Sequence, residues 1–225
     1  MRHPRRARGF TLVELLIVVT ILAIVAGIAI PSLMAAKSNA NDKAIVATMR
    51  AIATGQELAR THALIDTDKD GVGESATIPE LAGAVAVRGT GTKLRPPYIS
   101  WAMGAQGPEG FVTSHGFYFA LYLPDASGDG VIGAPASFAS VNADLSEHCW
   151  TCVAWPINRA TQGYATYFVN QNGDILCSRD ARYSGKASVP PPGCALAGVA
   201  PNHIDANALA VGVPGADGNT WVPVH

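Results

Sequence analysis

The chain has few charged residues and lacks the short motifs that mark common catalytic sites. Only 15% of its 225 residues are Asp, Glu, Lys or Arg, and residues 15–36 contain none of them. The motifs G-x-S-x-G and H-E-x-x-H and the glycine-rich phosphate loop are absent, and the six histidines are scattered. The sequence therefore predicts a protein that is not an enzyme.

An excess of positive charge is also missing. The formal net charge is −1, and four of the 16 basic residues lie within the first nine positions, which leaves 12 basic against 17 acidic residues in the remainder. General binding to nucleic acids depends on neutralising phosphates with Lys and Arg. The composition predicts no such binding, and the length predicts one domain, or two, with room for a hydrophobic core.

The uncharged segment, residues 15–36, is long enough to cross a bilayer. Its 22 residues would span about 33 Å as a helix, and the preceding Arg5, Arg6 and Arg8 predict that the rest of the chain is exported. A secretory signal peptide is the alternative, but the apolar run exceeds the usual length. It also continues into an amphipathic pattern, so we expect one helix from about residue 10 to about residue 63.

Two features inside this helix need an explanation. Gly27 and Pro31 are helix breakers, and a kink or local unwinding is expected near them. Glu14 is an acid at the edge of the apolar run, where a buried carboxylate costs on the order of 2.5–3.5 kcal/mol. Glu14 either lies near the membrane surface and reaches water, or it pairs with a cation brought to it.

The stretch RGFTLVELLIVVTILAIVAGIAIPS, residues 8–32, resembles the N-terminus of type IV pilins and of the pseudopilins of type II secretion. In that family a prepilin peptidase cuts after the Gly of a basic leader, and the new N-terminal residue is methylated. Carried over, Gly9 precedes the scissile bond, Phe10 becomes the methylated N-terminus, Glu14 is the fifth mature residue and Pro31 matches the usual helix proline. Beyond residue 35 the resemblance is one of architecture only.

The resemblance implies an organisation and a set of partners. Residues 1–9 would be the leader, 10–36 the transmembrane and polymerisation helix, 37–63 its amphipathic continuation and 64–225 the globular head. The prepilin would cross the bacterial inner membrane once and later enter an extracellular or periplasmic filament of identical subunits. The partners are the prepilin peptidase, which is also the N-methyltransferase, and the inner-membrane assembly machinery. Glu14 would pair with the terminal amine of a neighbouring subunit.

The head predicts an α+β fold of pilin type, in which a small antiparallel sheet packs against the long helix. Residues 117–123 alternate, with Phe117, Phe119, Leu121 and Leu123 expected on the helix side and the tyrosines on the other. Residues 150–156 predict a second strand, and a hairpin is expected to turn at residues 172–173. Residues 77–81 predict a short capped helix. The tail after residue 184 is expected to be irregular and to cover the sheet edge or contact other subunits.

Residues 66–74 begin like a calcium-binding loop. Asp66, Asp68, Asp70, the carbonyl of Val72 and Glu74 occupy ligand positions of the D-x-D-x-D-G pattern, but Thr77 stands where an EF-hand has its bidentate Glu. The alternative is a solvated acidic turn. A weaker candidate is the stretch DASGDG, with Asp125, Ser127 and Asp129. Calcium is the single cofactor that the sequence suggests.

Four cysteines, all in the head, predict two disulfides if the head enters an oxidising compartment; they are Cys149, Cys152, Cys177 and Cys194. A Cys177–Cys194 bond would tie the tail to the hairpin, but the sequence leaves the pairing open.

Two functional classes remain for the whole chain. The first is a structural subunit of a type IV pilus or of a related filament, including a secretion pseudopilus. The second is a membrane-anchored, calcium-dependent binding module in which the helix is a passive anchor. The processing of the N-terminus distinguishes them.

Overall fold

The computed structural model describes residues 9–224, so the predicted leader, apart from Gly9, lies outside the described residues. The chain divides into two units, residues 1–37 and residues 38–225, which we describe separately. Helix α1 (Leu12–Thr61) extends from the first unit into the second and has Pro31 in its interior. The prediction of one long helix is confirmed. The helix is continuous through Gly27 and Pro31, so of the predicted kink or local unwinding, the unwinding does not occur.

In the first unit, the helix exposes its apolar side chains all round. No residue from Leu12 to Lys37 is buried. An 18-residue window of α1 has a mean hydropathy of 2.9, which makes this helix long and apolar enough to cross a membrane. A helix that is hydrophobic on every side requires an apolar environment such as lipid or other helices.

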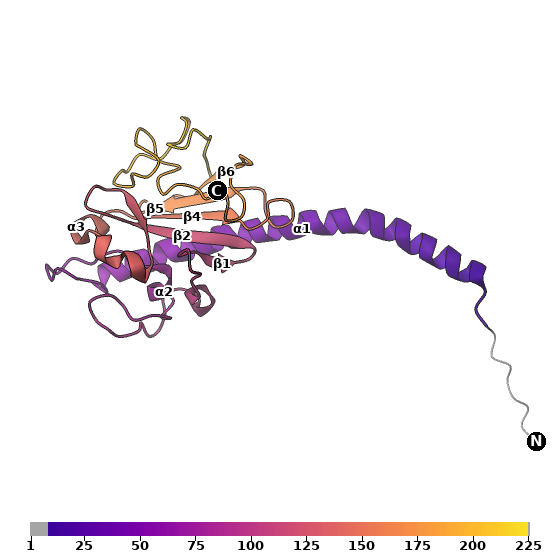
Figure 1. Ribbon diagram of the computed structural model, residues 1–225, viewed down its shortest axis with the longest axis horizontal. Helices are drawn as coiled ribbons and strands as arrows, with labels where there is room; N and C mark the ends of the chain where they lie inside the picture. Colours follow the sequence, from indigo (N-terminus) through magenta and orange to yellow (C-terminus); the bar gives the residue numbers. More distant parts are fainter. Residues whose placement is uncertain (1–8, 225) are drawn as a thin grey trace, which may run out of the picture. The chain divides into compact units, whose positions relative to one another are not determined.

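The second unit is built around one antiparallel sheet (Figure 1). Its strand order is β1-β2-β4-β5-β6-β7, and β3 pairs with the second half of β2. The strands are β1 (Val112–Ser114), β2 (Phe117–Pro124), β3 (Gly130–Ile132), β4 (Thr151–Pro156), β5 (Thr166–Asn170), β6 (Leu176–Ser178) and β7 (Val222–Pro223). The short helices are α2 (Ile78–Leu81), α3 (Ala143–Ser146) and the 3₁₀ helices η1 (Trp101–Gly104) and η2 (Pro135–Ser140).

One face of the sheet packs on the second half of α1. Ile45, Met49 and Ile52 are fully buried and recur at helical spacing, as the amphipathic pattern predicts. They share a core with Phe117, Phe119, Leu121 and Leu123 of β2, so the predicted inward face of this strand is confirmed. The predicted hairpin is also present, because β5 and β6 pair with Phe168 opposite Leu176, and Gly173 has a left-handed φ of 80°.

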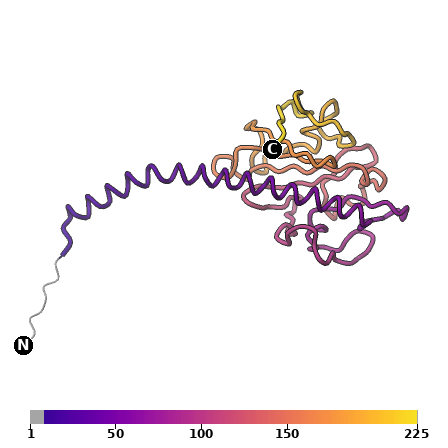
Figure 2. The backbone as a smooth tube through the Cα atoms, turned by 180° about the vertical axis from the view of Figure 1, so that it is seen from behind, coloured from indigo at the N-terminus to yellow at the C-terminus, as the bar shows by residue number. Residues whose placement is uncertain are grey.

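The other face of the sheet is covered by the C-terminal segment, which lies on the side away from α1 in Figure 2. Leu196, Ile204 and Trp221 of this segment are buried against Ala120 and Tyr122 of β2. Tyr122 lies on the face opposite the helix, as predicted, but the segment covers it and leaves it only 7% exposed. The tail was predicted to cover the sheet edge or to contact other subunits. It supplies β7 at the edge and also packs on a face of the sheet.

A buried ion cluster joins the segments that follow α1. Arg88 lies 3.2 Å from Glu80 and 3.7 Å from Glu74, and its side chain is 8% exposed. Glu80 also completes the predicted capping box of α2, since it accepts from the Thr77 N–H while Thr77 Oγ1 accepts from the Glu80 N–H. Both glutamates are almost fully buried, so they depend on Arg88 for a counter-charge.

All four cysteines are free thiols in this structure, and no disulfide is shown. Cys149 and Cys194 belong to the core under the C-terminal segment, whereas Cys152 and Cys177 face the α1 side. The Cys177–Cys194 bond considered from the sequence would have to pass through the sheet. Cys152 and Cys177 are separated by β5, which sets their strands about 10 Å apart, beyond the Cα separation of about 7 Å that a disulfide tolerates.

We predict that Arg88→Ala lowers the free energy of unfolding by about 3–5 kcal/mol, because it leaves Glu74 and Glu80 buried without their counter-charge. Urea unfolding of the full chain in detergent, followed by the fluorescence of the buried Trp155 and Trp221, measures the change. The control is Arg50→Ala, an exposed arginine, which should change the value by no more than about 0.5 kcal/mol. Equal midpoints for the two variants would show that the cluster contributes nothing.

We also predict that the native thiols resist alkylation. Burial, and secondarily Asp205, raises the pKa of Cys149 to about 12, so at pH 8 only about one thiol in 10⁴ is a thiolate. Burial likewise raises the pKa of Cys152, Cys177 and Cys194. Iodoacetamide should label almost no thiol in the folded chain and all four in urea without reductant, as counted by mass spectrometry. Fewer than four labels in urea would instead support the predicted disulfides.

Candidate functional site

The first candidate region is the start of α1, where Thr11 and Glu14 bond reciprocally. Glu14 Oε2 accepts from the Thr11 N–H at 2.9 Å and from Thr11 Oγ1 at 2.8 Å, and Thr11 Oγ1 accepts from the Glu14 N–H at 3.2 Å. This is a capping box, T-x-x-E, in which each side chain satisfies a backbone donor of the first helical turn. Glu14 therefore has a local structural role that the sequence analysis missed, although the same pattern was identified at residues 77–80.

The residues that the resemblance assigns to processing and assembly at this end, Gly9, Phe10 and Glu14, are exposed next to this cap. Gly9 and Phe10 precede the helix in extended, exposed chain, and Phe10 is 74% exposed. Glu14 is exposed as well, and its carboxylate has no Lys or Arg within ion-pair distance among residues 9–224. The geometry thus leaves one edge of the Glu14 carboxylate available to a cation, while Thr11 holds the other oxygen in place.

The second candidate region is the loop that follows α1. The helix ends where Ala63 takes a left-handed φ of 43° and the Leu64 N–H returns to the Ala59 carbonyl. The loop then folds back against the helix end, since a Cβ on Gly73 would lie 2.2 Å from the Arg60 carbonyl oxygen. Gly73 is therefore required for this close approach. The loop brings the carboxylates of Asp66, Asp68 and Asp70 within 4.8 Å of one another, as its spacing predicts.

Glu74, predicted as a ligand, points away from the three aspartates into the protein. It is 1% exposed and accepts from the Thr67 N–H at 2.6 Å and from the Thr67 hydroxyl. Its other oxygen lies 3.4 Å from Ser146 Oγ and 3.7 Å from Arg88. These contacts use both oxygens, so Glu74 ties the loop to α3 and to the ion cluster instead of facing a cation. Val72, whose carbonyl was predicted as a ligand, donates its N–H to Asp70 Oδ1 at 2.8 Å.

Two acids that the sequence analysis missed complete the cluster. Asp144, in the first turn of α3, and Glu147, at its C-terminal end, place their carboxylates within 4.8 Å of one another and of Asp68. Helix α3 is held beside the loop by the Ser75 N–H, which donates to the Ser146 carbonyl at 2.8 Å. No local signal in the sequence marks Asp144 and Glu147, because only the fold brings them to the loop.

The crowding of these acids is visible in their electrostatics. The pKa of Asp68 is raised by burial and by the charges of Asp70, Asp144 and Asp66, although it also accepts from the Asp70 N–H. The pKa of Glu147 is raised by burial and by Asp70, Asp68 and Asp144, and His148 opposes this shift. The mutual repulsion of several carboxylates favours binding of a proton or a cation.

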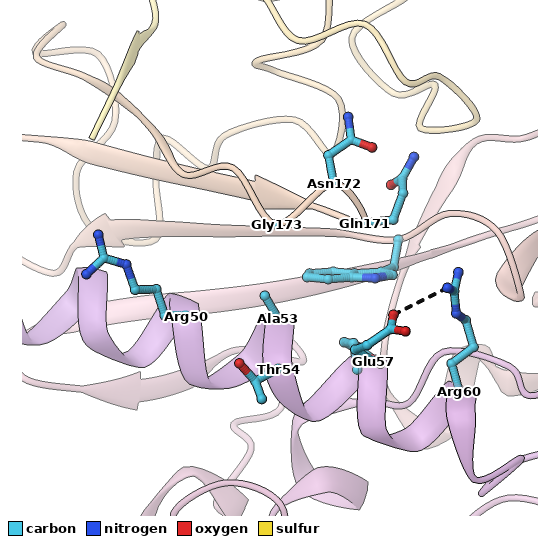
Figure 3. A pocket seen from close by; sticks show the side chains of 10 residues that line it. Arg50, Ala53, Thr54, Glu57, Arg60, Gln171, Asn172 and Gly173 are labelled. Atoms are coloured by element: carbon cyan, nitrogen blue, oxygen red, sulfur yellow. Dashed lines mark hydrogen bonds and ion pairs between the residues drawn. The ribbon is translucent and has the colours of Figure 1, made fainter. Parts of the chain in front are cut away.

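The other candidate features have no comparable chemistry. In the stretch DASGDG, Asp125 accepts from the N–H groups of Ser127 and Asp129 and so stabilises its own turn, while Asp129 lies 3.5 Å from His203. A pocket of about 580 Å³ lies between α1 and the turn of the β5–β6 hairpin (Figure 3). Its charged side chains include Glu57 and Arg60, which pair with each other at 3.3 Å.

Comparison with known proteins concerns the first region. The Prokaryotic N-terminal methylation motif matches residues 4–30. A stretch of 54 residues is 48% identical to the type IV wide pilus major component PilA4 of Thermus thermophilus; it covers 24% of this chain and 41% of that protein. The chain thus matches less than half the length of this curated relative. No solved structure matches the chain.

The position of the methylation motif agrees with the residues that carry the predicted resemblance. The methylation motif includes Gly9, Phe10 and Glu14, and the structure adds the long apolar helix and the antiparallel sheet expected of a pilin-like α+β fold. The resemblance of the N-terminal segment to type IV pilins, predicted from the sequence, is therefore confirmed.

Proposed function

We propose that this chain is a structural subunit of a type IV pilus or a pilus-like filament, assembled through the first half of α1. The observation that carries the proposal is the exposure of every side chain from Leu12 to Lys37 on a helix with an 18-residue window of mean hydropathy 2.9, in a segment that overlaps the N-terminal methylation motif at residues 4–30. Such a surface is stable in lipid before assembly and in a bundle of like helices afterwards.

Processing at Gly9 would supply the cation that Glu14 lacks. Cleavage between Gly9 and Phe10 creates a free amine four residues before Glu14, and N-methylation keeps its positive charge. In the filament, Glu14 of one subunit pairs with the Phe10 amine of another. A subunit displaced along the filament axis would leave a buried carboxylate unpaired. The pair therefore sets the axial register of the subunits and also stabilises the filament.

The proposed localisation and partners follow from this role. The precursor is anchored in the bacterial inner membrane by the apolar part of α1 with residues 38–225 exported, and the mature chain resides in an extracellular or periplasmic filament. Its partners are a prepilin peptidase that also methylates, an inner-membrane assembly machinery and further copies of the chain. Pro31 lies within the assembling segment. The role is structural and involves no catalytic step.

The type II secretion pseudopilin and the membrane-anchored binding module remain the alternatives. The pseudopilin shares the same processing and helix assembly and differs in the filament that it enters. The passive anchor shares the helix but requires neither cleavage nor a matched charge at Glu14.

We predict that the protein purified from its native cells begins at N-methylphenylalanine 10. Intact-mass and N-terminal peptide mass spectrometry measure this directly. A chain that retains Met1 would exclude a processed filament subunit and favour the passive anchor. The predicted cleavage depends on the basic leader and Gly9, so a Gly9→Val variant should remain unprocessed in the membrane.

We predict that Glu14→Gln abolishes surface filaments, as counted by electron microscopy of cells carrying each variant. Glutamine preserves a capping box with Thr11 but removes the charge, so the variant separates the two roles of Glu14. The matched control is Glu57→Gln, an exposed acid in the other half of α1, which should leave filaments intact. If Glu14 served only as a cap, Glu14→Gln would assemble normally and Thr11→Ala would be the defective variant.

A further inference from the structure

One carboxylate in the acidic cluster described above is buried and incompletely hydrogen-bonded. Glu147 is 6% exposed, yet its Oε1 has no hydrogen-bond partner among residues 9–224. Its other oxygen lies 3.7 Å from Nε2 of the exposed His148. A buried carboxylate oxygen without a donor loses its hydration without a compensating hydrogen bond, which is unfavourable. A carboxylate oxygen of Glu147 lies within 4.8 Å of carboxylate oxygens of Asp68 and Asp144, so a cation among these three acids would supply the missing partner.

Counter-charges from the protein do not fill this space. Within residues 9–224, none of Asp66, Asp68, Asp70 and Asp144 forms an ion pair with Lys or Arg. The nearby Arg60 donates to the main-chain carbonyl of Glu147 at 3.2 Å and pairs with Glu57. Arg88 is held by Glu74 and Glu80. Two groups of three carboxylates, which share Asp68, therefore lie side by side with no Lys or Arg side chain paired to them, and His148 is the one titratable base beside Glu147.

We propose that these two segments form a calcium-binding site whose ligands are Asp68 from the loop and Asp144 and Glu147 from α3, with Asp66 and Asp70 beside Asp68 adding negative charge. Calcium takes six to eight oxygen ligands in flexible geometry, which suits carboxylates from two separate segments. Magnesium is smaller, demands near-ideal octahedral geometry and usually keeps several waters, so it fits this set less well. Soft sulfur ligands, which favour other metals, are absent from the five residues.

The proposed ligand set differs from the loop predicted from the sequence. Asp144 and Glu147 replace Glu74, which becomes a positioning residue because it fixes Thr67 of the loop and lies beside Ser146 of α3. The loop therefore does not need the bidentate Glu that an EF-hand has at the position of Thr77. Thr77 caps α2 instead, and the last acidic ligands come from α3. A bound ion would join the segment after α1 to α3, and so fasten the two parts of the head that flank the helix end.

Calcium titration of the full chain in detergent tests the proposal. After treatment with EDTA, calorimetric titration with CaCl₂ should show binding, and 1 mM CaCl₂ should raise the Tm. Removing one charged ligand by Glu147→Gln or Asp144→Asn should weaken calcium affinity at least about tenfold, because affinity depends on the number of charged ligands. The matched controls are Glu109→Gln and Asp174→Asn, exposed acids far from the cluster in sequence, which should retain wild-type affinity.

A second measurement separates a ligand from a residue that merely supports the fold. In EDTA, Glu147→Gln should have a higher Tm than the wild type, because the substitution removes an unpaired buried charge from a group of like charges. In calcium the order should reverse, since only the wild type gains the ion. A structural role alone would lower the Tm of the variant equally in both conditions.

Three results would overturn the proposal. The first is a wild-type Tm that calcium leaves unchanged. The second is an unchanged calcium affinity in Asp144→Asn and Glu147→Gln together with a loss in Asp68→Asn, which would restrict any site to the loop. The third is an equal response to 1 mM MgCl₂, which would exclude a site selective for calcium. None of these results bears on filament assembly through the N-terminal helix.

Discussion

The packing of the second half of α1 on the sheet is the contact on which the rest of the head depends. Ile45, Met49 and Ile52 are completely buried against β2, and they hold the helix across the strands. Gln56 then ties the helix to the following segment, because its amide both donates to the Ala76 carbonyl and accepts from the Ala76 N–H. Through these contacts the end of α1 determines where the acidic loop begins.

Helix α1 is continuous, but its two halves have different surroundings. From Leu12 to Lys37 most of its side chains are apolar and none is buried, whereas from Ser38 onward one stripe is buried and the opposite face is exposed. This change in side-chain pattern, and not a break at Pro31, marks the boundary between the two units. A helix stabilised in its second half by tertiary packing can therefore present its first half to lipid or to other subunits.

Charged groups are used in the two units in contrasting ways. Glu14 is exposed, capped by Thr11 and available to a partner from outside the chain, whereas Glu74 and Glu80 are buried and satisfied by Arg88. Glu147 falls between these cases, because it is buried but incompletely bonded. A buried charge is tolerated only with a partner. The location of each acid thus indicates whether its partner is already in the fold or comes from elsewhere.

Local features of the sequence determined the helix, the alternation of β2, the capping box at Thr77 and Glu80, the hairpin turn and the resemblance to pilins, because each depends on residues close together in the chain. The tertiary structure alone decided that Glu74 turns inward, that Asp144 and Glu147 join the aspartates, that the tail covers the second face of the sheet, and that the cysteines are divided between its faces. These outcomes depend on which distant segments meet. Periodicity and spacing specify the face that a residue occupies within its own element, but the element opposite that face is chosen by the packing of the whole chain.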